Sequence, residues 1–523
     1  MKKKFYDILF NFIKPLILKR KKTSKILLIA DRGNIDVAIR VSMFAKIINE
    51  KKNLNVVVIS DFKNHISHEI YKKNNILKLI KFSEFFNKKK FNPIIIIKFL
   101  GIYFKFIYNF IFNKNYMEEF IKEYSINDIK VGDVLYDFYI RKNLNFLNLE
   151  GFSLHFLIVS FKNIFLVLLR LEFLKYIFKK YDVSLSLSSA KGYIALGNLL
   201  LRYSSKNKKK VVLFSGQFMK RYNKHTECFR TALRFTEKNI KKFDKIFKKK
   251  VINEYYTKKF IKLKLNYNNH GPYIVHKTFE SAYKKKQKLD KKFQKNILKK
   301  KICVLALNCF SDAPHYQGPL LFRDFYDHFV QTVNFIISTE PHDQIWLIKP
   351  HPAIKLYDEG GLIEKYIFKA NKKYLQMSPK NVNNLELFKH TDYLITAISS
   401  IALEYACYGK RPIICSENAY TGYGFTMEPT SIKNYFATIK TLNFQNKLTQ
   451  IEKLRARRIY YYLDNFANNN LEKSNLLPIR KNFSDEVYIK KLLINQNNYS
   501  NNNLIIKDNY YKSLDSRIKE LKI

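Results

Sequence analysis

The sequence predicts an α/β protein with two domains, each built around a parallel β-sheet. Short apolar runs alternate with helix-period stretches in the first half of the chain, and the same alternation returns in the second half. A lysine-dense segment without glycine, residues 284–301, separates the halves as a linker or solvated helix. Continuous apolar runs are typical of parallel strands because both faces of such a sheet are buried. At 523 residues the chain is long enough for two cores.

The first predicted domain, residues 24–283, begins with a β-α-β pattern. The run KILLIA (Lys25 to Ala30) is followed by a glycine-containing turn, a helix-period stretch and the run NVVVIS (Asn55 to Ser60). DVSLSL (Asp182 to Leu187) and VVLFSG (Val211 to Gly216) repeat this rhythm around another helical stretch. The pattern predicts a Rossmann-like domain.

Two very apolar stretches, residues 93–112 and 156–178, lie inside this domain. Each approaches the roughly 20 residues required to span a bilayer. Each is also interrupted by basic residues, namely Lys98 and Lys105 in the first and Lys162 and Arg170 in the second. Because such charges are unfavourable at the centre of a bilayer, we expect helices that lie in the membrane plane or in the domain core.

The second predicted domain, residues 302–465, has the same architecture. Its expected strands are ICVLAL (302–307), QIWLIK (344–349), DYLITA (392–397) and PIIC (412–415). Phe325, Phe329, Val333 and Ile336 recur at three- and four-residue steps, which predicts an amphipathic helix over 323–338.

The two ends of the chain differ from the domains. Residues 1–23 form a basic, amphipathic segment in which lysines and arginine stand where a signal peptide would have its cleavage site. Residues 466–523 are rich in asparagine and predict a weakly structured tail. The five cysteines form no C-x-x-C pair, which fits a reducing compartment. We therefore expect a cytoplasmic protein, peripheral at the inner membrane.

The formal net charge of +52 predicts attraction to polyanions such as nucleic acid, anionic lipid or a phosphorylated substrate. A composition shaped by AT-rich coding DNA is the alternative explanation, since Lys, Asn, Ile, Phe and Tyr are all abundant. D-x-D, G-x-x-x-x-G-K-[ST] and G-x-S-x-G motifs do not occur. These motifs are typical of metal-dependent glycosyltransferases of the GT-A fold, of P-loop nucleotide-binding proteins and of α/β-hydrolases, in that order. None of these three functions is therefore supported by its motif.

The first candidate binding motif is Lys349-Pro350-His351-Pro352, directly after an expected strand. Ligands bind at the carboxyl edge of a parallel sheet, and the two prolines hold His351 in an extended turn there. The imidazole could donate a hydrogen bond to a phosphate oxygen, with Lys349 adding positive charge. A histidine that only closes a strand end is the alternative.

The second candidate motif follows another expected strand and comprises Ser399, Ser400 and Glu404. Serine hydroxyls, unpaired N–H groups and the helix dipole suit a phosphate at the start of a helix, although an ordinary helix cap explains the serines too. With Ser400 as the N-cap, the reciprocal capping position is Leu403, so Glu404 is not required for capping. It lies one turn beyond Ser400 and could accept hydrogen bonds from both hydroxyls of a ribose; a solvated helix glutamate is the alternative.

Weaker candidates follow the first strand of each domain. Asp312 and His315 follow the strand at 302–307, and Gly33 and Asn34 follow the strand at 25–30. Residues at these edges could orient a donor or an acceptor. A structured loop is an equally good explanation.

The order strand, KPHP, helices, strand, SS-x-x-x-E, Gly, strand over residues 300–430 resembles the donor domain of GT-B glycosyltransferases. It looks most like the capsule polysaccharide biosynthesis group, which has an HP motif and a Ser/Thr motif and includes Kdo transferases, polysialyltransferases and glycerophosphate polymerases. The resemblance is thinner over 24–220. It implies two Rossmann-like domains facing a cleft, with extra helices, and a nucleotide-sugar donor bound by Lys349, His351, Ser399, Ser400 and Glu404.

The same resemblance implies an acidic general base from the first domain. The tract Val131 to Arg141 supplies Asp137, which we rank first, and Asp133. Asp358-Glu359-Gly360 imitates the acidic motif of the family but follows KPHP in the second domain. We therefore discount it.

The expected function is inverting transfer of a sugar from a CMP- or UDP-linked donor to a lipid-linked glycan acceptor of a capsule or surface polysaccharide. The nucleotide-sugar is the substrate, and neither a metal nor another cofactor is expected. An anionic membrane surface is an expected partner and nucleic acid is not, because the lysines are spread along the chain. The alternatives are a CDP-polyol phosphotransferase of the teichoic-acid type, a basic nucleic-acid-binding protein and a non-catalytic assembly scaffold.

Overall fold

The structure is a computed structural model. It describes residues 18–63, 65–87, 93–113, 116–142, 154–214, 219–230, 300–316, 318–357, 359, 361–379, 382, 384–442, 446–463, 487, 491 and 509–523. Most of the predicted N-terminal segment, residues 231–283 of the first predicted domain, and nearly all of the linker lie outside these residues, as does the tail between 464 and 508 apart from 487 and 491.

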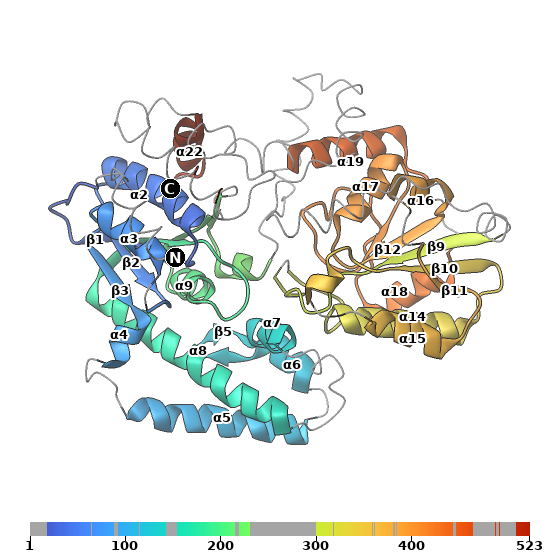
Figure 1. Cartoon of the computed structure of the whole chain (residues 1–523), viewed down its shortest axis with the longest axis horizontal. Helices are drawn as coiled ribbons and strands as arrows, with labels where there is room; N and C mark the ends of the chain where they lie inside the picture. The colour runs from blue at the N-terminus through green and yellow to red at the C-terminus, as the bar shows by residue number, and fades with distance from the viewer. Residues whose placement is uncertain are drawn as a thin grey trace. The chain divides into compact units, whose positions relative to one another are not determined.

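The described residues belong to two compact units (Figure 1). The first takes its residues from Met1–Tyr139, Leu149–Cys228 and Asn465–Ile523, and the second from Ile140–Asn148 and Phe229–Asp464.

The sheet of the first unit has the strand order β3-β2-β1-β6-β7-β8. Its strands are β1 (Lys25–Ala30), β2 (Asn55–Ser60), β3 (Lys78–Lys81), β6 (Asp182–Ser188), β7 (Lys210–Phe214) and β8 (Met219–Tyr222). All neighbours pair in parallel except β7 and β8. The order reverses between β1 and β6, as in a Rossmann fold. The apolar runs were thus read correctly, whereas short edge strands such as β3 carry too few apolar residues to be recognised.

Several helices and a small hairpin accompany this sheet. They are α2 (Ile35–Lys52), α3 (Ile66–Lys73), α4 (Phe82–Asn87), α6 (Tyr116–Glu123), α7 (Gly132–Lys142), α9 (Leu196–Lys206), η2 (His225–Phe229) and the hairpin β4 (Ser125–Ile126) and β5 (Ile129–Lys130).

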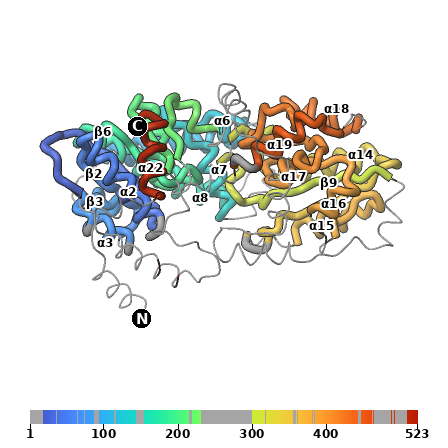
Figure 2. The backbone as a smooth tube through the Cα atoms, turned by 90° about the horizontal axis from the view of Figure 1, so that it is seen from above, coloured from blue at the N-terminus to red at the C-terminus, as the bar shows by residue number. Residues whose placement is uncertain are grey.

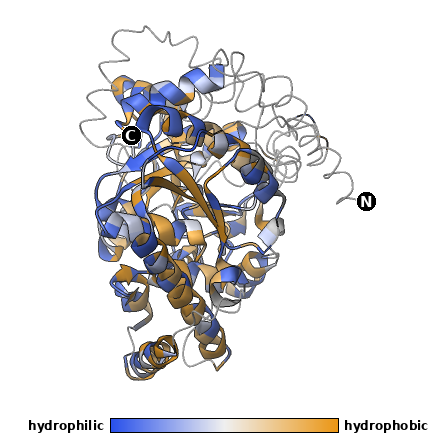
Figure 3. Ribbon diagram, turned by 90° about the vertical axis from the view of Figure 1, so that its left-hand side faces the viewer, coloured by the Kyte–Doolittle hydropathy of each residue, from blue (hydrophilic) through white to orange (hydrophobic). Residues whose placement is uncertain are grey.

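The two very apolar stretches form the helices α5 (Ile94–Phe112) and α8 (Leu154–Lys180). Both are long and apolar enough to cross a membrane by length and composition, but 44% of the apolar window of α8 is buried inside the unit, against 22% for α5. Figure 3 shows α5 at the bottom of the molecule with much apolar colour. The expectation of a core helix therefore fits α8 better than α5.

The end of the chain corrects the prediction of a weakly structured tail, as far as residues 509–523 are concerned. There α22 (Asn509–Glu520) packs against α2 (Figure 2). Tyr510, Leu514 and Ile518 are buried in the same core cluster as Phe44 of α2. Arg221 on β8 also donates hydrogen bonds to the carbonyls of Leu521 and Lys522, at 3.2 and 2.8 Å. The first unit is therefore completed by residues that lie far along the sequence.

The second unit has a fully parallel sheet with the order β11-β10-β9-β12-β13. The strands are β9 (Lys301–Ala306), β10 (Gln344–Lys349), β11 (Leu375–Met377), β12 (Tyr393–Thr396) and β13 (Ile413–Ile414). The helices are α14 (Phe325–Thr339), η3 (Ile354–Tyr357), α15 (Leu362–Ala370), α16 (Asn384–His390), α17 (Ser400–Tyr408), α18 (Ile432–Lys440) and α19 (Gln450–Tyr462). The predicted fold class, α/β with two Rossmann-like domains and additional helices, is confirmed.

Candidate functional site

The carboxyl edge of the second sheet aligns the two predicted motifs. Lys349, at the end of β10, pairs with Ala306 of β9, and Thr396, at the end of β12, pairs with the same Ala306. Neighbouring strands lie about 4.8 Å apart, so Lys349 and Thr396 are separated by roughly 10 Å. The loop of His351 and the loop of the two serines therefore leave the same edge of the sheet and flank the loop that follows β9. The strand order also reverses here, between β9 and β12.

The imidazole of His351 has a defined tautomer. Its Nδ1 accepts a hydrogen bond from the backbone N–H of Ala353 at 3.2 Å and lies 3.2 Å from Sγ of Cys309. Because Nδ1 accepts, the proton of the neutral ring is on Nε2. Burial lowers the pKa of His351, and the negative charge of Asp312 opposes that shift. His351 is thus held as a neutral imidazole with a donor at Nε2.

Glu404, on the helix that follows the two serines, interacts electrostatically with Lys349 of the KPHP motif. Burial raises the pKa of this carboxyl, while a hydrogen bond from Asn384 (2.9 Å), the charge of Lys349 and a hydrogen bond from Ser400 favour its ionised form. Burial likewise lowers the pKa of Lys349, and Glu404 opposes that shift. Glu404 is therefore a buried residue of the site and not a solvated helix glutamate.

Ser399, and not Ser400, is the N-cap of α17. Its Oγ accepts from the N–H of Ile401 at 3.3 Å, and its backbone is extended. Ser400 is the first helical residue and its side chain is exposed. Taking Ser400 as the cap was wrong by one residue, because a sequence with two adjacent serines offers two equivalent capping hydroxyls.

Three side chains that sequence reasoning did not select fix the backbone between β12 and α17. The amide of Asn308 donates to the carbonyl of Ile398 and accepts from its N–H. Asn418 donates to the carbonyl of Ala397 at 3.1 Å, and Tyr420 donates to that of Ser399 at 2.6 Å. Since these carbonyls are already satisfied, the loop is held in one conformation that presents the start of α17. An amide directly after the first strand was the available signal for Asn308.

Glu359 has a structural role in the loop after β9. Its carboxylate accepts hydrogen bonds from the N–H groups of Phe310 (2.8 Å) and Ser311 (2.7 Å) and from the Ser311 hydroxyl (2.7 Å). Burial raises its pKa, and these donors oppose that shift. Discounting the acidic motif around Glu359 as a base agrees with this arrangement.

The loop that Glu359 anchors carries the two weaker candidates of this domain. Asp312 is exposed and close enough to act on the charge of His351, whereas His315 lies further along and is half-buried. Asp312 therefore lies near His351, and a role of either Asp312 or His315 in binding stays a prediction.

Gly33 and Asn34 serve local structure at the carboxyl edge of the first sheet. Gly33 has a φ of +67°, which favours glycine, and Asn34 caps α2 by accepting from the N–H of Val37 at 3.2 Å. The alternative explanation, a structured loop, accounts for both residues. A ligand contact at this turn stays a prediction.

A buried polar network that the sequence did not reveal lies at the same edge. Asp31 accepts from the hydroxyls of Ser60 (3.1 Å) and Ser67 (2.9 Å), and Nε2 of His68 lies 3.5 Å from the carboxylate. Burial would raise the pKa of Asp31, but hydrogen bonds from His68, Gly33 and the two serines hold it below its usual value. The network fixes the turns after β1 and β2.

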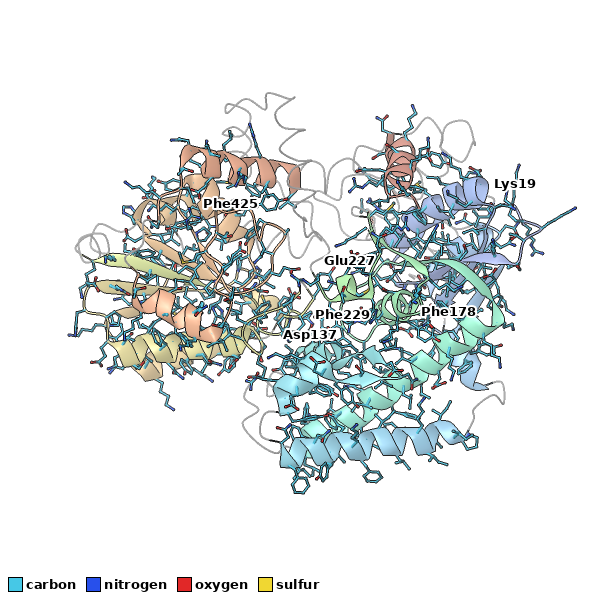
Figure 4. The ribbon with its side chains drawn as sticks, turned by 180° about the vertical axis from the view of Figure 1, so that it is seen from behind. Lys19, Asp137, Phe178, Glu227, Phe229 and Phe425 are labelled. Atoms are coloured by element: carbon cyan, nitrogen blue, oxygen red, sulfur yellow. The ribbon has the colours of Figure 1, made fainter. Side chains whose placement is uncertain are left out.

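The two carboxylates predicted as general base both lie on α7 and are buried. Asp133 forms a bidentate ion pair with Arg202 of α9, at 2.7 and 2.8 Å. Asp137 lies one turn further along α7 and is labelled in Figure 4. Both oxygens of Asp133 are held by a guanidinium, which argues against Asp133 as the base, while Asp137 keeps the first rank assigned to it from the sequence. Its role stays a prediction.

Within the described parts of the chain, no group of three or more His, Cys, Asp or Glu side chains could hold a metal ion. The expectation of a metal-independent reaction stays a prediction.

The similarity of this chain to known proteins is weak and is limited to structure. No family model matches it, and no curated protein matches it by sequence. Among solved structures, KpsC of Thermosulfurimonas dismutans, a beta Kdo 2,4 transferase, aligns with 16% identity and a TM-score of 0.21, covering 30% of this chain and 44% of that chain. The present chain thus spans less than half the length of KpsC.

Two further structures align over more of the sequence. The UDP-GlcNAc 2-epimerase of Methanocaldococcus jannaschii aligns with 12% identity and a TM-score of 0.24, covering 84% of this chain and 99% of that chain. The wall teichoic acid polymerase TagF aligns with 12% identity and a TM-score of 0.21, covering 78% and 99%. At such TM-scores these alignments carry no conclusion about activity or substrate. The chain is an α/β protein built from two Rossmann-like domains, which is the domain composition of GT-B enzymes.

Proposed function

We propose that the chain is a glycosyltransferase that binds a nucleotide-sugar donor at the carboxyl edge of the second sheet. One observation carries the proposal. Three loops, after β9, β10 and β12, meet at this edge and are connected by Asn308, by the Cys309–His351 contact and by the influence of Glu404 on Lys349. The edge thereby combines a neutral imidazole donor, a lysine and the start of a helix.

These groups suit the leaving nucleotide of a sugar transfer. When the acceptor hydroxyl attacks the anomeric carbon, the bond from that carbon to the phosphate oxygen breaks and negative charge develops on the phosphate. The Nε2–H of His351, the charge of Lys349 and the N–H groups at the start of α17 would stabilise that charge. The acceptor hydroxyl loses its proton to a carboxylate, for which Asp137 is the candidate. Attack opposite to the leaving group inverts the configuration.

The donor site is tested by thermal unfolding of purified protein with CMP-, UDP-, GDP- and CDP-linked donors. One donor class is expected to raise the melting temperature, since a ligand at 100 times its Kd stabilises the folded state by about 2.7 kcal/mol. His351→Ala should abolish the increase. The matched control is His390→Ala, because His390 ends α16 and leads into the start of β12, at the opposite edge of the sheet. The proposal fails if no donor stabilises the wild type or if both variants respond like it.

Product analysis then separates the related functions. Release of free CMP or UDP with a surface polysaccharide acceptor supports sugar transfer. Release of CMP from a CDP-polyol would indicate polyol-phosphate transfer at the same phosphate site, and binding without turnover would indicate an assembly scaffold. We further propose a lipid-linked glycan acceptor at the cytoplasmic face of the membrane, which assays with lipid-linked and free glycans would distinguish.

A further inference from the structure

One face of α5 exposes a row of large apolar side chains. We call this row, comprising Ile97, Leu100, Phe104, Tyr108 and Ile111, the α5 stripe. Its members recur at three- and four-residue steps and so lie along one side of the helix. Ile97 is 71% exposed and Phe104 is 64% exposed. A continuous apolar row of this kind on a protein surface marks an interaction site.

The opposite face of α5 holds the helix flat against the first unit. Phe99 packs on Phe161 and Phe165 of α8, with ring centroids 4.7 and 4.8 Å apart. The hydroxyl of Tyr103 donates to the carbonyl of Leu157 at 2.8 Å. An ion pair of Lys98 and Glu172 at 3.1 Å also joins α5 to α8, and charges such as Lys98 and Lys105 are unfavourable at the centre of a bilayer. The α5 stripe therefore lies on the side of α5 that faces away from α8.

The charge around the stripe identifies the partner. α5 contains Lys98 and Lys105 and no acidic residue; Lys98 is paired with Glu172 of α8, and Lys105 follows Phe104 of the stripe directly. An apolar row bordered by lysines is the pattern of a helix that lies in the headgroup region of an anionic bilayer. A second copy of this chain would bring the same lysines to this face, and like charges at an interface disfavour such a pairing.

We propose that the α5 stripe docks the protein on an anionic lipid bilayer, with α5 parallel to the membrane plane. The apolar side chains enter the boundary of headgroups and acyl chains, roughly 5–10 Å deep, and the lysines remain at the level of the headgroups. The inference does not rest on the proposed donor site, since it concerns another surface. Either can fail without the other.

A polarity-sensitive fluorophore on a single introduced cysteine tests this docking directly. The chain has five native cysteines, and all are buried, so a new surface thiol reacts selectively. Phe104→Cys carries the probe in the stripe. Phe368→Cys on α15 is the matched control, because Phe368 is also a phenylalanine, 88% exposed, on a helix of the second unit.

The expected result is a blue shift of the emission at position 104, and not at 368, when vesicles of phosphatidylglycerol and phosphatidylcholine are added. Vesicles of phosphatidylcholine alone should give a much smaller shift. Equal shifts at the two positions, or no shift at 104, would overturn the proposal. A probe at 104 that is already in an apolar environment before vesicles are added would also overturn it, since another protein surface would then cover the stripe.

Vesicle co-sedimentation of unlabelled protein provides the second measurement. The double variant Ile97→Gln with Phe104→Gln keeps the charge and is expected to bind the anionic vesicles at least 10-fold more weakly than wild type. Phe368→Gln should bind like wild type. Unchanged binding of the double variant, with an unchanged circular dichroism spectrum, would contradict a role for the stripe.

Discussion

The carboxylate of Asp133, a candidate general base by sequence, has a structural role in the first unit. Arg202 holds both of its oxygens inside the first unit, where neither partner is exposed to water. A buried charge that loses its partner is left with the full unfavourable free energy of desolvation. Asp133 therefore fixes α7 against α9.

Replacing Asp133 by alanine should destabilise the first unit by about 3–5 kcal/mol, because Arg202 would stay buried without its counter-ion. Chemical denaturation followed by far-ultraviolet circular dichroism measures the change. Glu118, on the exposed side of α6, provides a control carboxylate whose removal should have little effect. Equal stability of the Asp133 variant and wild type would contradict this role of the ion pair.

Asp137 is expected to affect catalysis and not donor binding. In the proposed transfer, Asp137→Asn should lower turnover by roughly 10²- to 10⁴-fold, since it removes the proton acceptor. The melting temperature increase caused by the donor should remain, because the donor binds to the second unit. Wild-type turnover of this variant would show that the base lies elsewhere.

At the scale of elements, the loop between β12 and α17 shows which part of the site the sequence could predict. The strand, the two serines and the helix follow from local patterns, and all were predicted to within a residue or two. The side chains that hold the loop were not. Asn308 lies 90 residues from Ile398, its backbone partner, and no local pattern encodes that pairing. The burial of Glu404 had the same cause, since it depends on packing around α17.

The pairing of α14 with α18 predicts a pH dependence of stability. His328 on α14 is buried, with Nε2 2.9 Å from the hydroxyl of Tyr435 on α18, and burial lowers the pKa of His328 from 6.5 to about 3. Below pH 6.5 the unfolded chain binds a proton that the folded unit does not. The stability that this histidine contributes is therefore complete above about pH 6.5 and is lost progressively as the pH falls towards 3.

This group alone should change the free energy of unfolding by ~1.4 kcal/mol per pH unit within that window. Urea unfolding at pH 7.5, 6 and 5 measures it, with the fluorescence of Trp346 as the signal. Trp346 is the one tryptophan of the chain and is buried in β10, so it reports on the second unit. His328→Gln should flatten the dependence. If wild type and variant lose stability in parallel, His328 is not the titrating group.

At the scale of the whole molecule, the two sheets could be predicted from the sequence. The packing of the C-terminal helix α22 into the first unit could not. Parallel strands have a strong apolar signal, so both halves were recognised as α/β. Residues 509–523 follow an asparagine-rich stretch, and the helix there has only Tyr510, Leu514 and Ile518 as a regular apolar row. A short helix gains its stability from packing and not from its own sequence. Its partner α2 lies more than 450 residues earlier.

Leu514→Ala should destabilise the first unit by about 2–5 kcal/mol, as expected for a buried leucine. The urea transition reported by Trp346 should stay unchanged, because that residue belongs to the second unit. Hydrogen exchange in α2 is the direct measurement and should become faster. Lys512→Ala, on the exposed side of α22, is the control. Slow exchange in α2 of the Leu514 variant would contradict the packing role of α22.

The position of α22 has a consequence for synthesis on the ribosome. Roughly 290 residues separate the end of β8 from the start of α22. At translation rates of about 5–20 residues per second, the nascent first domain waits roughly 15 to 60 s for its last helix. Throughout that interval the side chains of α2 that pack against α22 lack this partner, while the second domain is synthesised. The domain that begins the chain is thus the one that is completed last.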